Sequence, residues 1–81
     1  MTNTLHLVIS SVSENLYDGP ALSATLPASA GECTILPHHE PLVTTLKEGT
    51  IIVRIPNKET RAFPITSGVL EVSGARAVVL V

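Results

Sequence analysis

Short runs in which hydrophobic and polar positions alternate recur along the chain. In residues 5–10, "LHLVIS", every second residue is leucine or isoleucine, and residues 50–55, "TIIVRI", alternate in a similar way. Further runs of this kind are "RAFPIT", "VLEV" and "RAVVLV". Because successive side chains of an extended strand point to opposite faces, these runs predict short β-strands with one buried face.

Proline and glycine interrupt the chain too often for helices. The six prolines and five glycines leave no window of a few helical turns that is both free of them and periodic as a helix requires. Many short strands joined by tight turns are typical of a β-sandwich or barrel. We therefore predict an all-β fold in one domain that fills residues 1–81, since no repeat, low-complexity segment or linker divides the chain.

Turn-forming residues mark the boundaries between the predicted strands. Asp18 and Gly19 form a pair that tolerates positive φ, which predicts a turn before the next extended segment. Residues 56–60 predict a polar hairpin tip, and Gly74 predicts another turn. Pro64 has no backbone N–H to donate, so it predicts an edge strand or a bulge.

Charge and aromatic content argue against a nucleic-acid partner. Five Lys/Arg against seven Asp/Glu give a net charge of −2, and the basic residues are scattered. Tyr17 and Phe63 are the only aromatic residues, so neither a basic stripe nor a base-stacking platform is present. The same scarcity of aromatics predicts a core built from Val, Leu, Ile and Ala.

Cysteine usage and hydropathy indicate a soluble chain in a reducing compartment. The lone Cys33 has no partner for an intramolecular disulfide. The first residues, "MTNTLHLVISSV", lack the positive region of a signal peptide, and no apolar run approaches the roughly 20 residues that span a bilayer. We expect no insertion into a membrane, although the chain is compatible with work against a membrane complex.

The segment "GECTILPHHEPL", residues 31–42, concentrates the possible metal ligands. Cys33, His38, His39 and the more distant His6 are candidates for zinc. Adjacent residues of an extended segment point to opposite faces, so His38 and His39 would not naturally share one ion. The favoured interpretation is a solvated His38, a His39 that anchors a turn, and a Cys33 that packs as a small apolar residue. No metal and no cofactor are expected.

Catalytic constellations are not expected either. Asp18 is the only aspartate, and the glutamates are spread singly along the chain. The run "GECTILP" lacks the glycine pattern and the lysine of a phosphate-binding loop. These patterns indicate a non-catalytic interaction domain.

The order of the motifs resembles the N-terminal β-domain of the F-type ATP synthase epsilon subunit. That family combines a Gly-acid start, an Ile-Leu-Pro-x-His-x-Pro-Leu segment, a later glycine before a β-branched strand, and a Gly-Gly-x-x-Glu-Val run. The positions that match in order are Gly31, Glu32, Ile35, Leu36, Pro37, His39, Pro41, Leu42, Gly49, Gly68, Glu71 and Val72. The opening run "LHLVISSVSENLYDG" is similar to the family's first strand and hairpin, so the resemblance covers the whole chain.

Four positions depart from the family pattern. Thr34 stands where glycine is common in the family, and His38 stands where glycine or asparagine is common. Glu40 replaces a small residue, and Ser67 replaces the first glycine of a pair. Thr34 is expected to adopt ordinary β geometry, because threonine does not share the access of glycine to positive φ.

A further departure is that the family usually continues into a C-terminal helical hairpin, whereas this chain stops at Val81. A truncated chain and a naturally short member both remain open, so inhibition and ATP sensing by a hairpin are not carried over.

The resemblance implies a fold, a function and partners. The fold is a flattened β-sandwich of about ten short, mostly antiparallel strands. The function is that of a non-catalytic central-stalk subunit that grips the gamma subunit, rests on the membrane c-ring and couples proton or sodium flow to ATP synthesis. The location is peripheral, on the cytoplasmic side of a bacterial inner membrane.

Contact sites follow from the same resemblance. The Gly31-Glu32 turn is expected to face the c-ring loops, and the strand that carries Glu71 is expected to lie near gamma. A loop tip near both gamma and the ring is formed by His38, His39 and Glu40. A solvated turn remains an equal alternative for Glu32 and for Lys47-Glu48.

Two other functions stay open, and two mutations are singled out. The alternatives are a metal-binding module that uses Cys33, His38 and His39, and a β-sandwich that binds a peptide or glycan, against which the near absence of aromatics argues. Gly68 is expected to need positive φ or a close backbone approach. Lys58, at an expected exposed tip, is expected to tolerate alanine.

Overall fold

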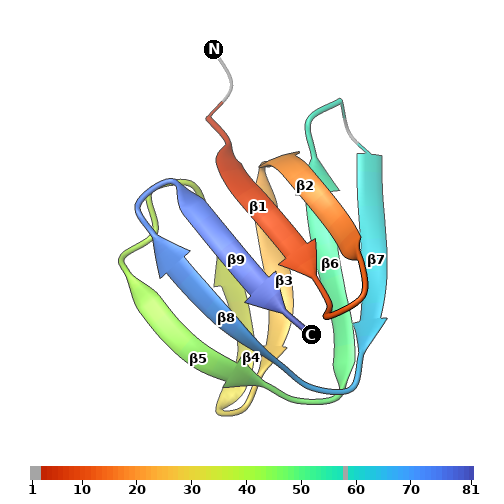
Figure 1. The fold of residues 1–81 in the computed structure, drawn as a ribbon. Helices are drawn as coiled ribbons and strands as arrows, with labels where there is room; N and C mark the ends of the chain where they lie inside the picture. The colour runs from red at the N-terminus through yellow and green to blue at the C-terminus, as the bar shows by residue number, and fades with distance from the viewer. Residues whose placement is uncertain (1–2, 58) are drawn as a thin grey trace.

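The computed structural model describes residues 3–57 and 59–81, which form nine β-strands and no helix (Figure 1). The strands are β1 (Leu5–Ser10), β2 (Asn15–Ala21), β3 (Ser23–Ala28), β4 (Gly31–Ile35), β5 (Leu42–Leu46), β6 (Gly49–Ile55), β7 (Glu59–Ile65), β8 (Gly68–Ser73) and β9 (Arg76–Leu80). Within this described part, therefore, no helix is long and apolar enough to cross a membrane. The predicted all-β fold is confirmed.

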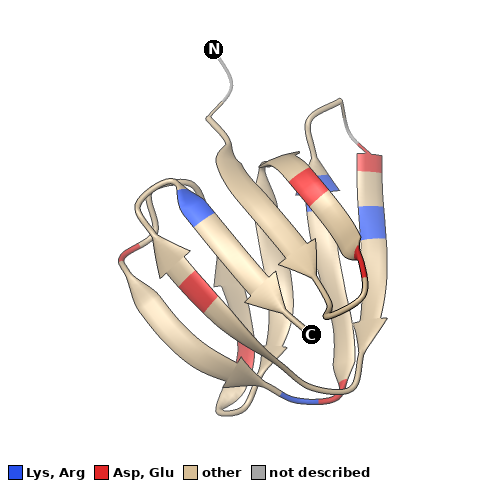
Figure 2. Cartoon of the chain, in the orientation of Figure 1, with Lys and Arg blue, Asp and Glu red and all other residues tan. Residues whose placement is uncertain are grey.

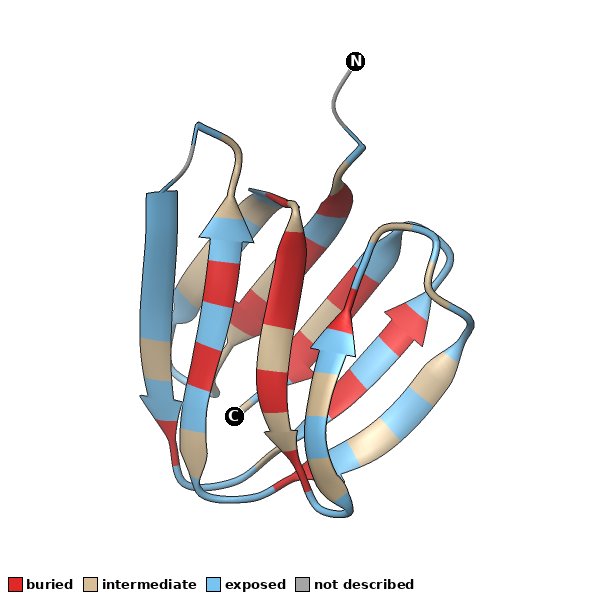
Figure 3. Cartoon of the chain, turned by 180° about the vertical axis from the view of Figure 1, so that it is seen from behind, coloured by how far each residue is buried: buried red, intermediate tan, exposed pale blue. Residues whose placement is uncertain are grey.

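The strands form two facing layers that share one hydrogen-bonded path. The path runs β2-β1-β9-β8-β5-β3-β6-β7, with β4 paired to β3. It bends between β5 and β3, where the two strands share only the pair Ala28 and Leu46. We call β2-β1-β9-β8-β5 the first sheet and β4-β3-β6-β7 the second sheet (Figures 1 and 3). All pairings are antiparallel except that of β1 with β9.

The core lies between the two sheets and is aliphatic, as the sequence predicted. Figure 3 shows buried residues alternating with exposed ones along β6 and with partly buried ones along β3. The largest side chains that are fully buried are Leu7, Ile9, Leu26, Ile35, Ile51, Val53, Leu70 and Val79. No buried side-chain nitrogen or oxygen among the described residues lacks a hydrogen-bond partner. Burial of aliphatic surface, at about 25 cal/mol per Å², is therefore the main stabilising term.

The two aromatic residues close one side of the sandwich, where edge strands β2 and β7 meet. The ring centroids of Tyr17 and Phe63 are 6.2 Å apart. The Arg61 guanidinium lies 5.7 Å from the Tyr17 centroid and 5.2 Å from that of Phe63. Burial raises the pKa of the Tyr17 phenol, and Glu59 raises it further, while Arg61 opposes both. The cluster thus links the two edge strands through side-chain contacts.

One predicted turn is wrong. Asp18 and Gly19 lie inside β2, opposite Val8 and Leu7 of β1. The chain reverses earlier, at residues 11–14, where the Ser11 N–H donates to the Glu14 carbonyl over 2.8 Å and the Ser11 hydroxyl accepts from the Glu14 N–H over 3.2 Å. The serine side chain thus closes the turn. At Gly19, inside β2, an added Cβ would lie 3.3 Å from the Tyr17 hydroxyl oxygen.

The other turn predictions are confirmed. The hairpin between β6 and β7 turns between Ile55 and Glu59, slightly tighter than the predicted 56–60, whereas Lys58 lies outside the described residues. Gly74 turns with φ 64°. Pro64 lies on β7, an edge strand. Thr34 lies in β4 and is not among the described residues with positive φ.

Candidate functional site

The segment between β4 and β5 is a shaped loop. The His39 N–H donates to the Leu36 carbonyl over 3.2 Å, which closes a four-residue turn with Pro37 second and His38 third. His38 has φ 68°, as the third residue of a type II turn requires. The His39 ring nitrogen Nδ1 lies 2.8 Å from the Glu40 carbonyl, which can only accept, so Nδ1 donates. His38 is exposed and His39 anchors the turn, as the sequence predicted.

This turn gives a first testable prediction, an increase in stability from His38→Gly. A non-glycine residue in the left-handed region costs about 1–2 kcal/mol, which glycine would avoid. Glycine also raises the conformational entropy of the unfolded chain, which offsets about 0.4–1 kcal/mol of this gain. The free energy of unfolding should therefore rise by about 0.5–1 kcal/mol, measured by urea denaturation. His39→Gly is the matched control and should lower stability, since His39 has no positive φ and its ring bond is lost. A His38→Gly variant less stable than the wild type would contradict the prediction.

The candidate metal ligands do not form a metal centre in the described structure. Across residues 3–57 and 59–81, no group of three or more His, Cys, Asp and Glu side chains is arranged to hold a metal ion. Cys33 is half-buried on β4 and packs against the core. His6 instead lies 2.7 Å from the Asp18 carboxylate on the surface, where both side chains are about half exposed.

The predicted contact residues occupy three separate places. Gly31 and Glu32 begin β4, whereas the loop of His38, His39 and Glu40 follows the other end of that strand. Glu71 is exposed in the middle of β8. Gly31 has φ 139°, in a region essentially restricted to glycine. The backbone conformation alone therefore explains why glycine occupies this position.

Three turns gather at the end of the sandwich where β4 begins, and we call this the turn end. They are Ser29-Ala30, Lys47-Glu48 and Thr66-Ser67. The strand pairs that bring them together are Ala28 with Gly31, Ala28 with Leu46, Gly49 with Ile65 and Leu46 with Gly68. Figure 2 shows acidic and basic positions distributed over the described part of the ribbon, where no continuous basic stripe forms.

The outer face of the first sheet carries an apolar strip among exposed polar and charged side chains. Its apolar strip consists of Val8, Val43, Val69, Val78 and Leu80. Val43 is 68% exposed, Leu80 55% and Val69 42%. Cross-strand pairing joins four of these residues, because Val78 lies opposite Val8 and Leu80 lies opposite Val69. Glu71 separates Val43 from Val78. A continuous exposed apolar surface is a feature of protein interfaces, whereas single exposed hydrophobic residues are ordinary.

The outer face of the second sheet is different in character. The hydroxyl oxygens of Thr25 and Thr34 lie 3.1 Å apart across β3 and β4. Thr50, Arg54 and Ile52 face outward on β6, and Ile52 is the exposed large hydrophobic residue there. One face of the sandwich is thus suited to burial against a partner and the other to water.

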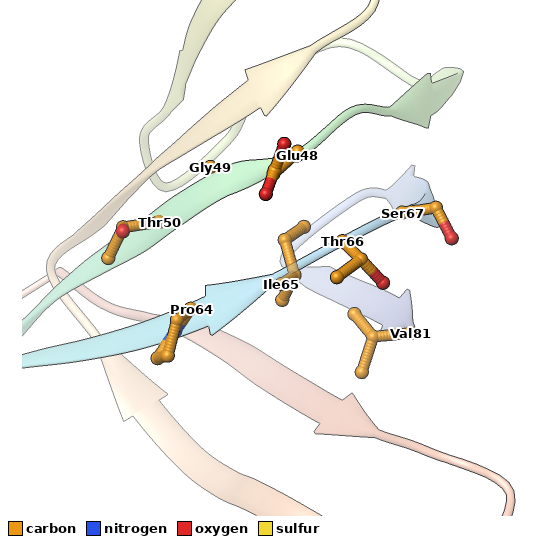
Figure 4. A pocket seen from close by; sticks show the side chains of 8 residues that line it. All are labelled: Glu48, Gly49, Thr50, Pro64, Ile65, Thr66, Ser67 and Val81. Atoms are coloured by element: carbon orange, nitrogen blue, oxygen red, sulfur yellow. The ribbon is translucent and has the colours of Figure 1, made fainter.

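A cavity of about 540 Å³ opens at the turn end (Figure 4). Its lining comes from the start of β6, the end of β7, the turn that follows it and the last residue of the chain. The lining residues are Glu48, Gly49, Thr50, Pro64, Ile65, Thr66, Ser67 and Val81. Sequence reasoning did not find this cavity, because its lining comes from three segments that are distant in sequence.

The apolar strip was also missed, although the sequence carries a signal for it. A half-buried strand alternates apolar and polar residues, yet "RAVVLV" and "GVLEV" place apolar residues at both odd and even positions. On one side of the sheet these residues enter the core, and on the other side they remain exposed. Such a run departs from the apolar-polar alternation of an antiparallel sheet that has one solvated face.

The fold and surface together define a class, a small two-sheet β-sandwich with an apolar strip on one outer face. Residues 4–81 match the family model described as "ATP synthase, Delta/Epsilon chain, beta-sandwich domain". The chain belongs to this family of ATP synthase delta/epsilon β-sandwich domains.

Curated relatives agree with the family assignment. The chain is 37% identical over 67 residues to an ATP synthase epsilon chain of Nitrosospira multiformis, covering 83% of this chain and 48% of that one. It is 40% identical over 78 residues to an ATP synthase epsilon chain of Bordetella parapertussis, covering 95% of this chain and 55% of that one. The chain thus spans about half the length of the curated relatives it matches.

Solved structures show the same fold. A chain in the cryo-EM structure of the Euglena gracilis mitochondrial ATP synthase with OSCP, F1 and c-ring superimposes with a TM-score of 0.89 at 20% identity, covering 95% of this chain and 49% of that one. A chain in the Tetrahymena thermophila mitochondrial ATP synthase central stalk and c-ring superimposes with a TM-score of 0.78 at 11% identity, covering 99% of this chain and 63% of that one.

Proposed function

We propose that this chain is a non-catalytic central-stalk component of an F-type ATP synthase. In this role it binds the gamma subunit and the c-ring, and couples proton or sodium flow to ATP synthesis. The family assignment and the similarity to chains of central-stalk and c-ring assemblies support the proposal. The single structural observation that carries it is the apolar strip on the first sheet.

The apolar strip is the proposed gamma-binding face. Its exposed valine and leucine side chains form a surface whose burial would contribute the apolar term of binding. Glu71 stands in the middle of this strip, exposed and without an ion pair to another described residue. Covering a carboxylate without a partner is costly, so gamma is expected to place a basic or N–H donor opposite Glu71.

The Ser29-Ala30 side of the turn end is the proposed c-ring contact. Glu32 lies next to this turn, at the start of β4. Short polar turns of this kind suit contact with the polar loops of a membrane ring. The loop of His38, His39 and Glu40 lies at the other end of β4, so its proposed contact is with gamma alone. The proposed location is peripheral, on the cytoplasmic side of a bacterial inner membrane, consistent with the bacterial relatives.

Calorimetry with purified gamma subunit from the same source tests this function. One-to-one binding is expected, with a negative heat-capacity change because apolar surface is buried. A parallel pull-down with detergent-solubilised c-ring carrying gamma tests the second contact. Absence of gamma binding by a chain shown to be folded would contradict the proposal.

A further inference from the structure

The cavity at the turn end combines an apolar floor with a polar rim. Pro64, Ile65 and Val81 supply the apolar part, and hydroxyl groups come from Thr50 and Thr66. Glu48 supplies the only carboxylate among the lining residues. In Figure 4, Ile65 and Val81 border the same space as Glu48, although the three come from different segments of the chain.

This lining has the chemistry that complements a long basic side chain. Lysine and arginine carry an aliphatic stem that packs on apolar surface and a cationic head that seeks acceptors. The carboxylate and hydroxyl oxygens at the rim are such acceptors. The volume of about 540 Å³ falls in the range of pockets that hold small ligands, so it has room for a side chain of this length.

Glu48 has no competing cation in the described structure. The ion pair found among residues 3–57 and 59–81 is that of His6 with Asp18, on another surface. Lys47 follows Leu46 directly, yet it does not line the cavity. The Glu48 carboxylate is exposed, so its charge is available to an incoming group.

The cavity lies beside one end of the apolar strip. Leu80 belongs to the strip and Val81, the next residue, lines the cavity. Val69 belongs to the strip on the neighbouring strand, and Ser67 lines the cavity two residues before it. A partner that covers the lower part of the strip therefore lies within reach of the cavity.

We infer that the cavity receives a lysine or arginine side chain of the protein that covers the apolar strip, with Glu48 as the acceptor of its charge. This inference rests on the proposed function for the identity of that protein, the gamma subunit, and adds the chemistry of one contact. It also assigns a role to Glu48, for which the sequence left a solvated turn and an interface role equally open.

The first test measures gamma binding by charge-altered variants. Glu48→Gln keeps the size of the side chain and is expected to weaken gamma binding about tenfold, the loss typical of one hydrogen bond to a charged group. Glu48→Lys should weaken binding more, and wild-type affinity should fall more steeply with salt than that of Glu48→Gln. Glu59→Gln removes the same charge on β7, outside the cavity, and should leave binding unchanged.

The second test uses n-butylammonium as a free mimic of a lysine side chain, with butyrate as its anionic control. Titration of the isolated chain should shift the NMR amide signals of Thr50, Ile65 and Val81 with butylammonium, and the shifts should vanish in Glu48→Gln. Gamma binding that Glu48→Gln leaves intact would overturn the inference while the proposed function stands. A folded wild type without gamma binding would overturn the proposed function, and absence of cavity shifts with butylammonium would then overturn the inference independently.

Discussion

Replacing Gly68 by valine is expected to lower the free energy of unfolding by about 2–4 kcal/mol. A Cβ at this position would lie 2.6 Å from the Leu80 carbonyl oxygen and 3.1 Å from Val81 Cγ1. The first contact is with backbone, and Leu80 is paired with Val69 in the β8–β9 ladder, so the clash cannot be relieved by turning a side chain. A domain of this size has a stability of about 4–12 kcal/mol, so the loss is a large fraction of it.

The measurement is urea denaturation of the variant beside wild type and Ser67→Val. Ser67 is the exposed neighbour of Gly68, so valine there introduces the same side chain without the clash and should change stability by less than about 0.5 kcal/mol. The sequence left two reasons for glycine at position 68, a positive φ and a close backbone approach. Gly68 is not among the described residues with positive φ, so close approach is the reason. Equal stability of Gly68→Val and wild type would contradict the prediction, because it would mean that β8 and β9 can separate locally without loss of stability.

Val69→Asp is expected to reduce gamma affinity roughly thirtyfold or more. Val69 lies in the apolar strip, beside Leu80 on β9 and Thr45 on β5. Docking on this face would bury an unpaired carboxylate against apolar surface, and such a central defect costs about 2–4 kcal/mol. Titration calorimetry with gamma measures the effect, after circular dichroism has shown that the variant is folded.

Ile52→Asp is the matched control for this effect. Ile52 is 36% exposed on β6, in the second sheet, so aspartate there costs a similar loss of β-propensity without touching the strip. Its gamma affinity should equal that of wild type. Wild-type gamma affinity in both aspartate variants would show that the strip is not part of the interface. The same loss of affinity in both variants would point to a general effect on folding.

The strands were predictable from sequence where their alternation was strong, as in residues 5–10 and 50–55. These strands bury one face, so the two-residue period reports the fold directly. The turn predicted at Asp18-Gly19 was wrong because the pairing of β2 with β1 outweighs the local turn preference of these two residues. The strand order was beyond local reasoning, because β1 and β9 pair although about seventy residues separate them.

The candidate site was predictable only in part. The positive φ of His38 agrees with the family preference for glycine or asparagine there, so the shape of that loop followed from the resemblance. The partners assigned to Glu32, Glu40 and Glu71 stay predictions, since a contact depends on a surface of another molecule. The cavity depends on packing between distant segments, which no periodicity in the sequence reports.

The parallel pairing of β1 with β9 has a mechanical consequence. The two strands lie side by side in the first sheet and run in the same direction, with partners from His6 and Arg76 to Ser10 and Leu80. The Val81 N–H extends the contact by donating to the Ser10 carbonyl over 2.9 Å. A force that pulls Leu5 and Leu80 apart acts along the strands, so the hydrogen bonds of this pair are loaded in shear and share the load. Tension between the two ends of the domain therefore meets its strongest resistance at this pair, whereas a hairpin pulled from its open end would unzip one bond at a time.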